Sequence, residues 1–248
     1  MGPPLRPSPE DVQTVRKLLG GAEGSRLLLG VTPELSGLTG QLVALDSCAG
    51  MVAALWRGNR AGHHAVLGNW LDMPFADDSF DGVVGDGSFT LLEYPLQYRQ
   101  LFSHLERVMK PGGLLIVRIF AAPETGETCA MACSDAMHGK IQGFHAFKWR
   151  LSMAMTSEAC NPNLRVADTH EMFNHLLPDR ERLARASGWS MEDISTIDFY
   201  QGSSARYSYP TLTQFRHIIP PGFRETGLIR GTYELAERCP ILALELAQ

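Results

Sequence analysis

The chain has 248 residues, of which 44% are hydrophobic and 20% charged, with a formal net charge of −5. This composition is typical of a globular protein with one large core, and the acidic balance, with no Lys/Arg cluster among aromatic residues, disfavours a nucleic-acid partner. No apolar run approaches the roughly 18 residues of a membrane span and the first ten residues carry no signal pattern, so we expect a cytoplasmic protein without a membrane partner.

The first predicted element is a helix in "SPEDVQTVRKLLGG", residues 8–21. Ser8 suits the N-cap and Pro9 suits the first helical position. Val12 and Val15 then fall on one face, and the glycines at the end of the segment stop the helix. We therefore expect an amphipathic helix ahead of the first strand.

Four short apolar runs follow, and they read as strands. They are "RLLLG" (26–30), "QLVALD" (41–46), "DGVVGDG" (81–87) and "GLLIVRIF" (113–120). Their apolar residues are continuous rather than alternating, which is typical of parallel strands covered on both faces. Between the last two runs, "PLQYRQLFSHLERVMK" has helical spacing and ends before a Pro-Gly-Gly turn, so the order strand, helix, strand predicts a crossover unit.

In such sheets ligands bind at the carboxyl ends of the strands. The segments at those ends are 30–34, 46–47, 69–72 and 86–88. Asp46 ends an apolar strand and is well placed to accept both hydroxyls of a ribose. The alternative is an acid that caps the next helix, and this residue alone leaves both open.

Three stretches resemble a known family. "LVALDSCAGM", "GNWLDMPFADDSFDGVVGDGSFTLL" and "LERVMKPGGLLIV" resemble successive motifs of the class I S-adenosylmethionine-dependent methyltransferases, in the order of that family and over residues 26–120. The resemblance implies a Rossmann-like, doubly wound, mostly parallel seven-stranded sheet with an antiparallel last strand and helices on both faces. It also implies S-adenosyl-L-methionine as the cofactor.

The C-terminal half resembles the family only in outline. We expect one domain over residues 1–248, with a possible lid at 121–170 and an insertion at 201–238. The resemblance implies that "DISTIDFY" (193–200) and "CPILALELA" (239–247) form the antiparallel pair of strands that closes the sheet.

The first motif departs from the family pattern. Leu28, Thr32 and Glu34 replace an acid and two glycines, and only Gly30 remains. Asp46 also comes sooner after Gly30 than the roughly 20 positions usual in glycine-loop folds. We predict a crossover helix of about two turns, capped by Thr32 and started by Pro33 and Glu34. Glu34 either replaces the acid missing at position 28 or only favours the helix start.

This loop suits some ligands better than others. A pyrophosphate needs free N–H groups and positive potential, whereas Pro33 removes a donor and Glu34 adds a negative charge. NAD and nucleoside triphosphates are therefore disfavoured. S-adenosylmethionine carries sulfonium and ammonium cations, so a loop with one acid can hold it.

By the resemblance, several residues acquire roles toward the cofactor. Asp46 corresponds to the ribose-binding acid, Met51 to the apolar residue near the adenine, and Asn69 to the acceptor of its amino group. Trp70 either contacts the ring or is a core aromatic residue, and Asp86 either lies at the methyl group or is a turn acid. The predicted cofactor contacts are Gly30, Val31, Thr32, Glu34, Asp46, Ser47, Met51, Asn69, Trp70, Asp86, Gly87 and Ser88.

The catalytic candidates are fewer. A base is useful only where the acceptor holds a proton, and Asp86, His145 and His170 are candidates, with Tyr207 and Tyr209 nearby in sequence. Each histidine could equally be an ordinary packed or surface residue. The Met-rich segment 129–156 suits a lid over an apolar small-molecule acceptor or plain helix packing. The identity of the acceptor and the oligomeric state stay open.

The five cysteines form an odd, scattered set, which suits a reducing compartment. Cys129, Cys133 and His138 could lie together, but no second pair of ligands stands at metal spacing, so we predict no metal. A rival function is a non-catalytic relative that serves as a binding or regulatory partner, favoured by the altered first motif. The polar residues at the strand ends argue against it.

Overall fold

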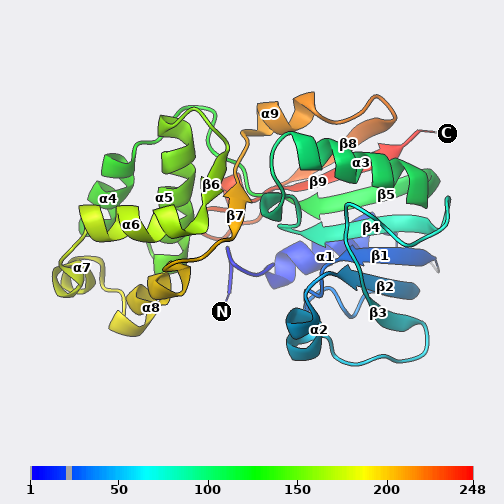
Figure 1. Cartoon of the computed structure of the whole chain (residues 1–248), viewed down its shortest axis with the longest axis horizontal. Helices are drawn as coiled ribbons and strands as arrows, with labels where there is room; N and C mark the ends of the chain where they lie inside the picture. The colour runs from blue at the N-terminus through cyan, green and yellow to red at the C-terminus, as the bar shows by residue number, and fades with distance from the viewer. Residues whose placement is uncertain (1, 21–23, 248) are drawn as a thin grey trace.

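The computed structural model describes residues 2–20 and 24–247. The chain forms a sheet half and a helical half, and the N-terminus lies between the two (Figure 1). In the described part of the chain, no helix is both long enough and apolar enough to cross a membrane.

The sheet half is built on seven strands in the order β3-β2-β1-β4-β5-β9-β8. The first five are parallel, and β9 runs antiparallel to both β5 and β8. The strand order reverses between β1 and β4, which is the switch point where open α/β sheets bind ligands. The predicted doubly wound sheet with an antiparallel last strand is therefore confirmed. The strands are β1 (Ser25–Leu29), β2 (Gln41–Asp46), β3 (His63–Leu67), β4 (Phe80–Asp86), β5 (Met109–Arg118), β8 (Phe223–Ile229) and β9 (Ile241–Leu246).

Helix α1 (Pro9–Leu18) covers one face of the sheet. Its start is fixed by a capping box, in which the Asp11 N–H donates to Ser8 Oγ and the Ser8 N–H donates to Asp11 Oδ2. Val12 and Val15 are buried, as their spacing predicts. They belong to one apolar cluster with residues from five strands, Leu28, Ala44, Val84, Ile116 and Ala243.

Helix α3 (Leu96–Val108) covers the opposite face together with the short helix α9 (Leu212–His217). Leu101, Phe102 and Leu105 are fully buried. The Phe102 ring lies 6.1 Å from the Phe215 ring of α9, measured between centroids. The crossover helix between β4 and β5 is therefore confirmed.

The connection from β1 to β2 differs from the prediction. Residues 30–40, all of which are described, form consecutive turns rather than a two-turn helix, and the Leu35 N–H donates to Thr32 O at 3.1 Å. Gly30 and Gly40 have φ of +96° and +85°, and the Ser36 hydroxyl bonds to the Pro33 carbonyl, so local geometry competes with a helix. Leu35 and Leu38 are nevertheless buried against the sheet. Helix α2 (Ala49–Leu55) follows β2.

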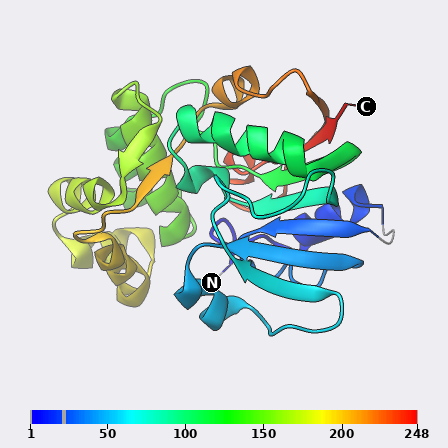
Figure 2. The ribbon, with the colours of Figure 1, turned by 45° about the vertical axis from the view of Figure 1, so that its right-hand side comes forward.

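The helical half, residues 123–209, is a single stretch inserted between β5 and β8 in sequence. Its core includes Phe147, Phe173 and Trp189, and α5 is buried along most of its length. The two ends of the stretch meet, because the Ala122 N–H donates to Pro210 O at 3.2 Å. Figure 2 shows the arrowheads of β1 and β2 pointing toward this half. Its elements are α4 (Cys129–Met137), α5 (Phe144–Glu158), β6 (Asn163–Arg165), α6 (Val166–Leu176), α7 (Arg180–Ser187), α8 (Met191–Ser195), η2 (Thr196–Tyr200) and β7 (Arg206–Ser208).

The strand predicted at residues 193–200 is wrong. Ser190 caps α8, acids fill its first turn, and Ile194 and Ile197 are buried at helical spacing, so the segment is helical. The partner of β9 is instead β8, which lies inside the segment expected to be an insertion at 201–238. Strand β8 is an edge strand in which three consecutive residues, Arg224, Glu225 and Thr226, are polar and exposed, so it lacks the continuous apolar run of the other strands.

Tyr98 of α3 connects the two halves. Its hydroxyl donates to Ser208 Oγ at 2.7 Å, and Ser208 donates in turn to the Leu92 carbonyl at 2.8 Å. We expect Tyr98→Phe to lower the free energy of unfolding by about 1 kcal/mol, because a buried hydrogen bond is lost. Tyr94→Phe, which removes a more exposed hydroxyl bonded to Gln214 O, is the matched control and should cost less. Urea denaturation measures both, and equal losses would contradict the assignment.

Candidate functional site

The predicted site residues lie at the carboxyl edge of the sheet. Strand β1 pairs with β2 on one side and with β4 on the other, so Leu29 is in register with Leu45 and with Gly85. The residues that follow these three positions, Gly30, Asp46 and Asp86, are therefore brought side by side. This convergence of segments far apart in the sequence is what the strand pattern predicts.

Gly30 lies between a carboxylate and an indole ring. A Cβ at this position would stand 3.8 Å from Asp46 Oδ2 and 3.7 Å from Trp70 Cζ2. The backbone here has φ of +96°, which favours glycine, and the Gly30 N–H donates to Leu45 O at 2.8 Å. A ligand that enters between Asp46 and Trp70 can thus approach the backbone closely.

Asp46 uses one carboxylate oxygen locally and leaves the other open. Oδ1 accepts the Cys48 N–H at 2.8 Å, which is an Asx turn leading into α2. Among the described residues, Oδ2 has no hydrogen-bond partner. Ser47 is exposed, and Met51 is 46% exposed on the first turn of α2. The capping alternative and the ligand alternative are compatible in this geometry, because each takes one oxygen.

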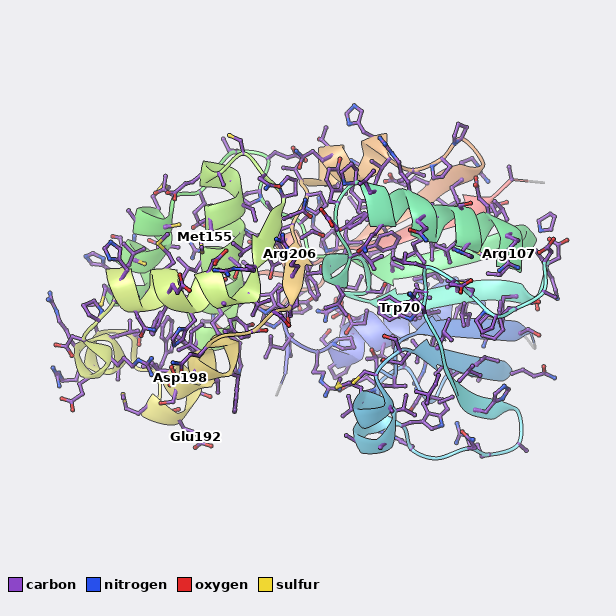
Figure 3. All side chains as sticks on the ribbon, in the orientation of Figure 1. Trp70, Arg107, Met155, Glu192, Asp198 and Arg206 are labelled. Atoms are coloured by element: carbon purple, nitrogen blue, oxygen red, sulfur yellow. The ribbon has the colours of Figure 1, made fainter. Side chains whose placement is uncertain are left out.

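The turn after β3 is closed by its own hydrogen bonds. Asn69 Oδ1 accepts the Leu71 N–H at 2.9 Å, so one of the two acceptor positions of this oxygen is used within the turn. Trp70 is partly buried, packs against the core on the α3 side, and donates from Nε1 to Leu45 O at 2.6 Å. The Trp70 ring therefore packs against the core and also borders the candidate site. Figure 3 labels Trp70 in the sheet half.

Position 28, where the family has an acid, lies within β1, and Leu28 is fully buried there. Val31 is also buried, and Thr32 is partly exposed. Glu34 forms an ion pair with Arg6 from the N-terminal segment, with 3.4 Å between Oε2 and Nη1. Since no helix begins at Thr32, the expectation that Glu34 only favours a helix start is wrong.

Asp86 is held in a buried ion pair that sequence reasoning missed. Its Oδ1 accepts from Arg118 Nε at 2.5 Å, and the two side chains are 7% and 3% exposed. Arg118 also lies 3.9 Å from Asp11 and donates to the Tyr233 hydroxyl at 3.0 Å. Burial raises the pKa of Asp86 and the charge of Arg118 opposes this, while Asp11 and Glu34 add to the rise. An arginine inside the apolar run "GLLIVRIF" is the signal that could have revealed the pair.

Gly87 and Ser88 complete the edge after β4. Gly87 has φ of +64°, and the Phe120 ring occupies the space that a Cβ would need. Ser88 Oγ is buried and has no hydrogen-bond partner among the described residues. The ring of Phe120 also stacks under Arg118, whose guanidinium carbon is 5.0 Å from the ring centroid. The strand edge thus passes directly into an aromatic surface.

We call Phe120, Trp149, Tyr207 and Tyr209 the aromatic cluster. The centroid of Trp149 lies 3.9 Å from that of Phe120, 6.5 Å from that of Tyr207 and 5.7 Å from that of Tyr209. Trp149 Nε1 is buried and has no partner among the described residues, which leaves a strong donor unused. The cluster joins the edge at Gly87 to the helical half.

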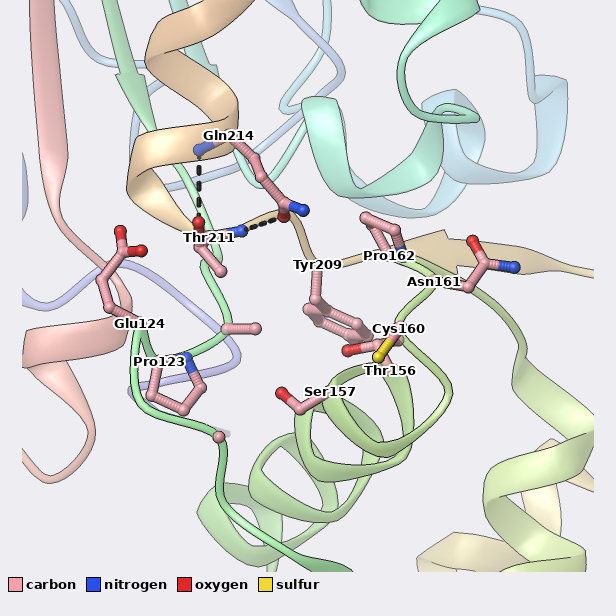
Figure 4. Close-up of a pocket in the computed structure, with 12 residues that line it drawn as sticks. Pro123, Glu124, Thr156, Ser157, Cys160, Asn161, Pro162, Tyr209, Thr211 and Gln214 are labelled. Atoms are coloured by element: carbon pink, nitrogen blue, oxygen red, sulfur yellow. Dashed lines mark hydrogen bonds between the residues drawn. The ribbon is translucent and has the colours of Figure 1, made fainter.

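A cavity of about 270 Å³ lies at the far side of this cluster (Figure 4). Tyr209 lines it, together with the segment after β5, the end of α5 and the start of α9. Glu124 is its charged side chain, and its carboxylate accepts the Thr213 N–H at 2.8 Å. A continuous series of rings thus runs from Gly87 to this cavity.

The two candidate histidines occupy different surroundings. His170 Nε2 lies 3.2 Å from Asp198 Oδ1 and 3.0 Å from Asn174 Nδ2, and Arg180 pairs with the same Asp198. Figure 3 labels Asp198 in the helical half, so His170 belongs to a polar network there rather than to the strand edge. His145 is the second residue of α5. Burial and then Lys148 lower its pKa, and its Nδ1 is buried without a partner among the described residues.

The two cysteines of α4 are held as neutral thiols. Burial raises the pKa of Cys129 to about 12 and that of Cys133 to about 11. Within residues 2–20 and 24–247, no group of three or more His, Cys, Asp or Glu side chains is arranged to hold a metal ion.

The Asp86 ion pair yields a stability prediction. Asp86→Asn should lower the free energy of unfolding by about 3 kcal/mol or more, because Arg118 stays buried with only the more distant Asp11 to offset its charge. Asp77→Asn breaks an exposed pair with Arg107, in which Asp77 is 73% exposed, and should change stability by about 0.5 kcal/mol at most. Chemical denaturation compares the two, and a cost for Asp86→Asn no larger than the control would show that the buried pair contributes little.

Comparison with known proteins places this fold. Residues 28–117 match the family described as methyltransferase domain. Demethylmenaquinone methyltransferase of Corynebacterium efficiens is 33% identical over 117 residues, 46% of this chain and 45% of that protein. The bifunctional biotin biosynthesis protein BioHC of Teredinibacter turnerae is 34% identical over 105 residues, 40% of this chain and 17% of that protein. The chain spans less than half the length of the curated relatives it matches.

Solved structures agree on the fold over nearly the whole chain. The N-methyltransferase NodS of Bradyrhizobium japonicum, in complex with S-adenosyl-L-homocysteine, aligns with a TM-score of 0.51 at 12% identity and covers 95% of this chain and 85% of its own. A putative S-adenosylmethionine-dependent methyltransferase of Listeria monocytogenes aligns with a TM-score of 0.55 at 9% identity, over 96% and 98% of the two chains. Residues 28–117 are thus similar in sequence to the methyltransferase-domain family, and the overall fold is similar to that of solved S-adenosylmethionine-dependent methyltransferases.

Proposed function

We propose that the protein is an S-adenosylmethionine-dependent methyltransferase that acts on a small-molecule acceptor. The observation that carries the proposal is the arrangement at Gly30, where a free carboxylate oxygen of Asp46 and the Trp70 ring flank a backbone position without a side chain. In class I methyltransferases, this is where the ribose and adenine of the cofactor lie.

The residues present fit this cofactor. Asp46 Oδ2 is free to accept ribose hydroxyls, and Gly30 allows the ligand to approach the backbone. Met51 and Trp70 offer apolar surface to the adenine, and Asn69 Oδ1 has a second lone pair for the amino group while the first accepts the Leu71 N–H. Gly87 and Ser88 border the methyl end of the site.

The same residues disfavour a pyrophosphate. Dinucleotides bind to the free N–H groups of a helix that begins directly after the first strand. Here residues 30–40 are turns, and Glu34 places a negative charge among them. The ligand that suits this loop carries positive charge, as S-adenosylmethionine does.

The proposed chemistry is a direct displacement. The bound cofactor supplies a methyl group on a cationic sulfur, and the protein mainly aligns the acceptor with it. His145 is a candidate base from the sequence; the structure places it on α5 near Lys148 and Asp193, and burial lowers its pKa and so favours the neutral imidazole.

The surface that would contact the methyl acceptor is formed by aromatic side chains. The aromatic cluster stands against Gly87, and the unused N–H of Trp149 offers one donor within an apolar surface. Such a surface suits a small, largely apolar molecule with a ring and a polar substituent. The names of the relatives and of one aligned structure, a 1,6-didemethyltoxoflavin-N1-methyltransferase, also describe enzymes that act on small molecules.

A second candidate is the non-catalytic relative. It is favoured by two departures in the first motif, the buried Leu28 in β1 and the turns at residues 30–40. Both would have to be compatible with a ligand for the first proposal to hold. Binding measurements distinguish the two.

We expect S-adenosylmethionine and S-adenosylhomocysteine to raise the melting temperature, and NAD and ATP to leave it unchanged. A ligand at 100 times its dissociation constant adds about 2.7 kcal/mol to stability. Asp46→Ala should weaken binding of S-adenosylmethionine by about 1.5–3 kcal/mol, because a charge-assisted pair of hydrogen bonds is lost. Isothermal calorimetry gives these affinities.

The control for Asp46→Ala is Asp168→Ala, which removes an exposed carboxylate paired with Arg165 on α6. It should not change the affinity. Stabilisation by NAD alone would overturn the proposal, and no response to any of the four ligands would favour the non-catalytic candidate.

The aromatic cluster yields a separate prediction on the acceptor. Trp149→Phe keeps a ring but removes the unused donor, so turnover with an accepted small aromatic substrate should fall by about ten-fold while cofactor affinity stays the same. Production of S-adenosylhomocysteine across a panel of phenols, quinols and ring amines measures this. Unchanged turnover in the folded variant would remove Trp149 from acceptor binding.

A further inference from the structure

The N-terminal segment, residues 2–8, lies against both halves of the molecule. Pro4 and Pro7 are buried, and Leu5 packs against the core of the helical half. Arg6, next to Leu5, reaches the loop after β1 and pairs with Glu34 at 3.4 Å. The segment thus places a guanidinium at the edge of the sheet, 28 positions before its partner in sequence.

The Arg6–Glu34 pair is open to a ligand. The two side chains are 27% and 33% exposed, unlike the fully enclosed pair of Asp86 and Arg118. Glu34 is also close enough to Asp86 for its charge to raise the pKa of that carboxyl. The pair therefore lies on the same side of the sheet edge as Gly30 and Asp86, and solvent reaches both charges.

The loop after β1 lacks charged groups for the amino-acid end of the cofactor, and the Arg6–Glu34 pair can supply them. The amino-acid end of the cofactor carries an ammonium and a carboxylate. Leu28 offers no charge for the ammonium, and the turns at 30–40 offer no helix N-terminus for the carboxylate. Glu34 and Arg6 have the two opposite charges required.

We propose, resting on the function proposed above, that Glu34 and Arg6 together bind the amino-acid end of the cofactor. Glu34 accepts from the ammonium and Arg6 donates to the carboxylate. Their mutual ion pair is replaced by two ion pairs with the ligand. A partly exposed pair adds little to stability on its own, so this exchange is inexpensive. Arg6 lies outside residues 28–117, the segment matched by the family.

The test compares two ligands that differ only at this end. S-adenosylhomocysteine has the ammonium and the carboxylate, whereas 5′-methylthioadenosine keeps the adenosine and a neutral sulfur but lacks both charges. By calorimetry, Arg6→Gln and Glu34→Gln should each weaken S-adenosylhomocysteine by about ten-fold or more, since each loses one charge-assisted contact. Binding of 5′-methylthioadenosine should change less than two-fold, which is roughly the scatter expected for a contact not made.

Two further variants separate ligand binding from a structural tie. The charge exchange, Arg6→Glu with Glu34→Arg, restores an ion pair between the segment and the loop. If the pair only ties the segment down, this variant should regain both melting temperature and affinity. If the pair binds the ligand, the melting temperature recovers but S-adenosylhomocysteine stays weak. Arg216→Gln, which breaks a pair with Glu225 of similar exposure, controls for loss of an ion pair elsewhere.

The outcomes are distinct. A selective loss of S-adenosylhomocysteine supports the inference. Equal effects on both ligands, or none, overturn it while leaving the proposed function intact, because both ligands still bind the wild-type protein. A wild-type protein that binds neither ligand overturns the proposed function itself, and the inference with it.

Discussion

One buried guanidinium organises much of the sheet half. A charge that is only 3% exposed must be offset by opposite charge and hydrogen bonds, and Arg118 obtains these from several elements. Asp86 comes from β4, Asp11 from α1, and Tyr233 from the chain between β8 and β9. Phe120, which stacks on the same group, begins the path into the helical half. The Arg118 side chain thereby fixes the end of β4, helix α1 and the aromatic cluster relative to one another.

The sequence predicted those elements whose residues carry their own signal. Buried parallel strands appear as continuous apolar runs, so β1, β2, β4 and β5 could be recognised directly. Strand β8 could not, because an edge strand exposes polar residues and shows no such run. The segment 193–200 misled because its isoleucines are compatible with either element, and the cap at Ser190 decides for a helix. In the first loop, glycines and a local serine bond prevail over good helix-start residues.

The candidate site, like the fold, contains residues that the sequence could identify and residues that it could not. Gly30 and Asp46 could be identified because each stands next to a recognisable strand, and parallel pairing brings them together. The ion pairs of Arg118 with Asp86 and of Arg6 with Glu34 span 32 and 28 positions. A local sequence pattern cannot identify such ion-pair partners, since only the folded chain determines which distant charges meet. The unused donor of Trp149 is likewise visible only once its neighbours are in place.

The chain enters the helical half after Ala122 and returns to the sheet half at Pro210, and these two residues are hydrogen-bonded to each other. The core of the helical half is largely its own, centred on residues such as Phe147 and Phe173. A stretch with adjacent ends and a separate core can be exchanged or remodelled as a unit without disturbing strand order. A related helical stretch grafted between the same two residues, in evolution or by design, could therefore change the side chains that face the strand edge while keeping Gly30 and Asp46 in place.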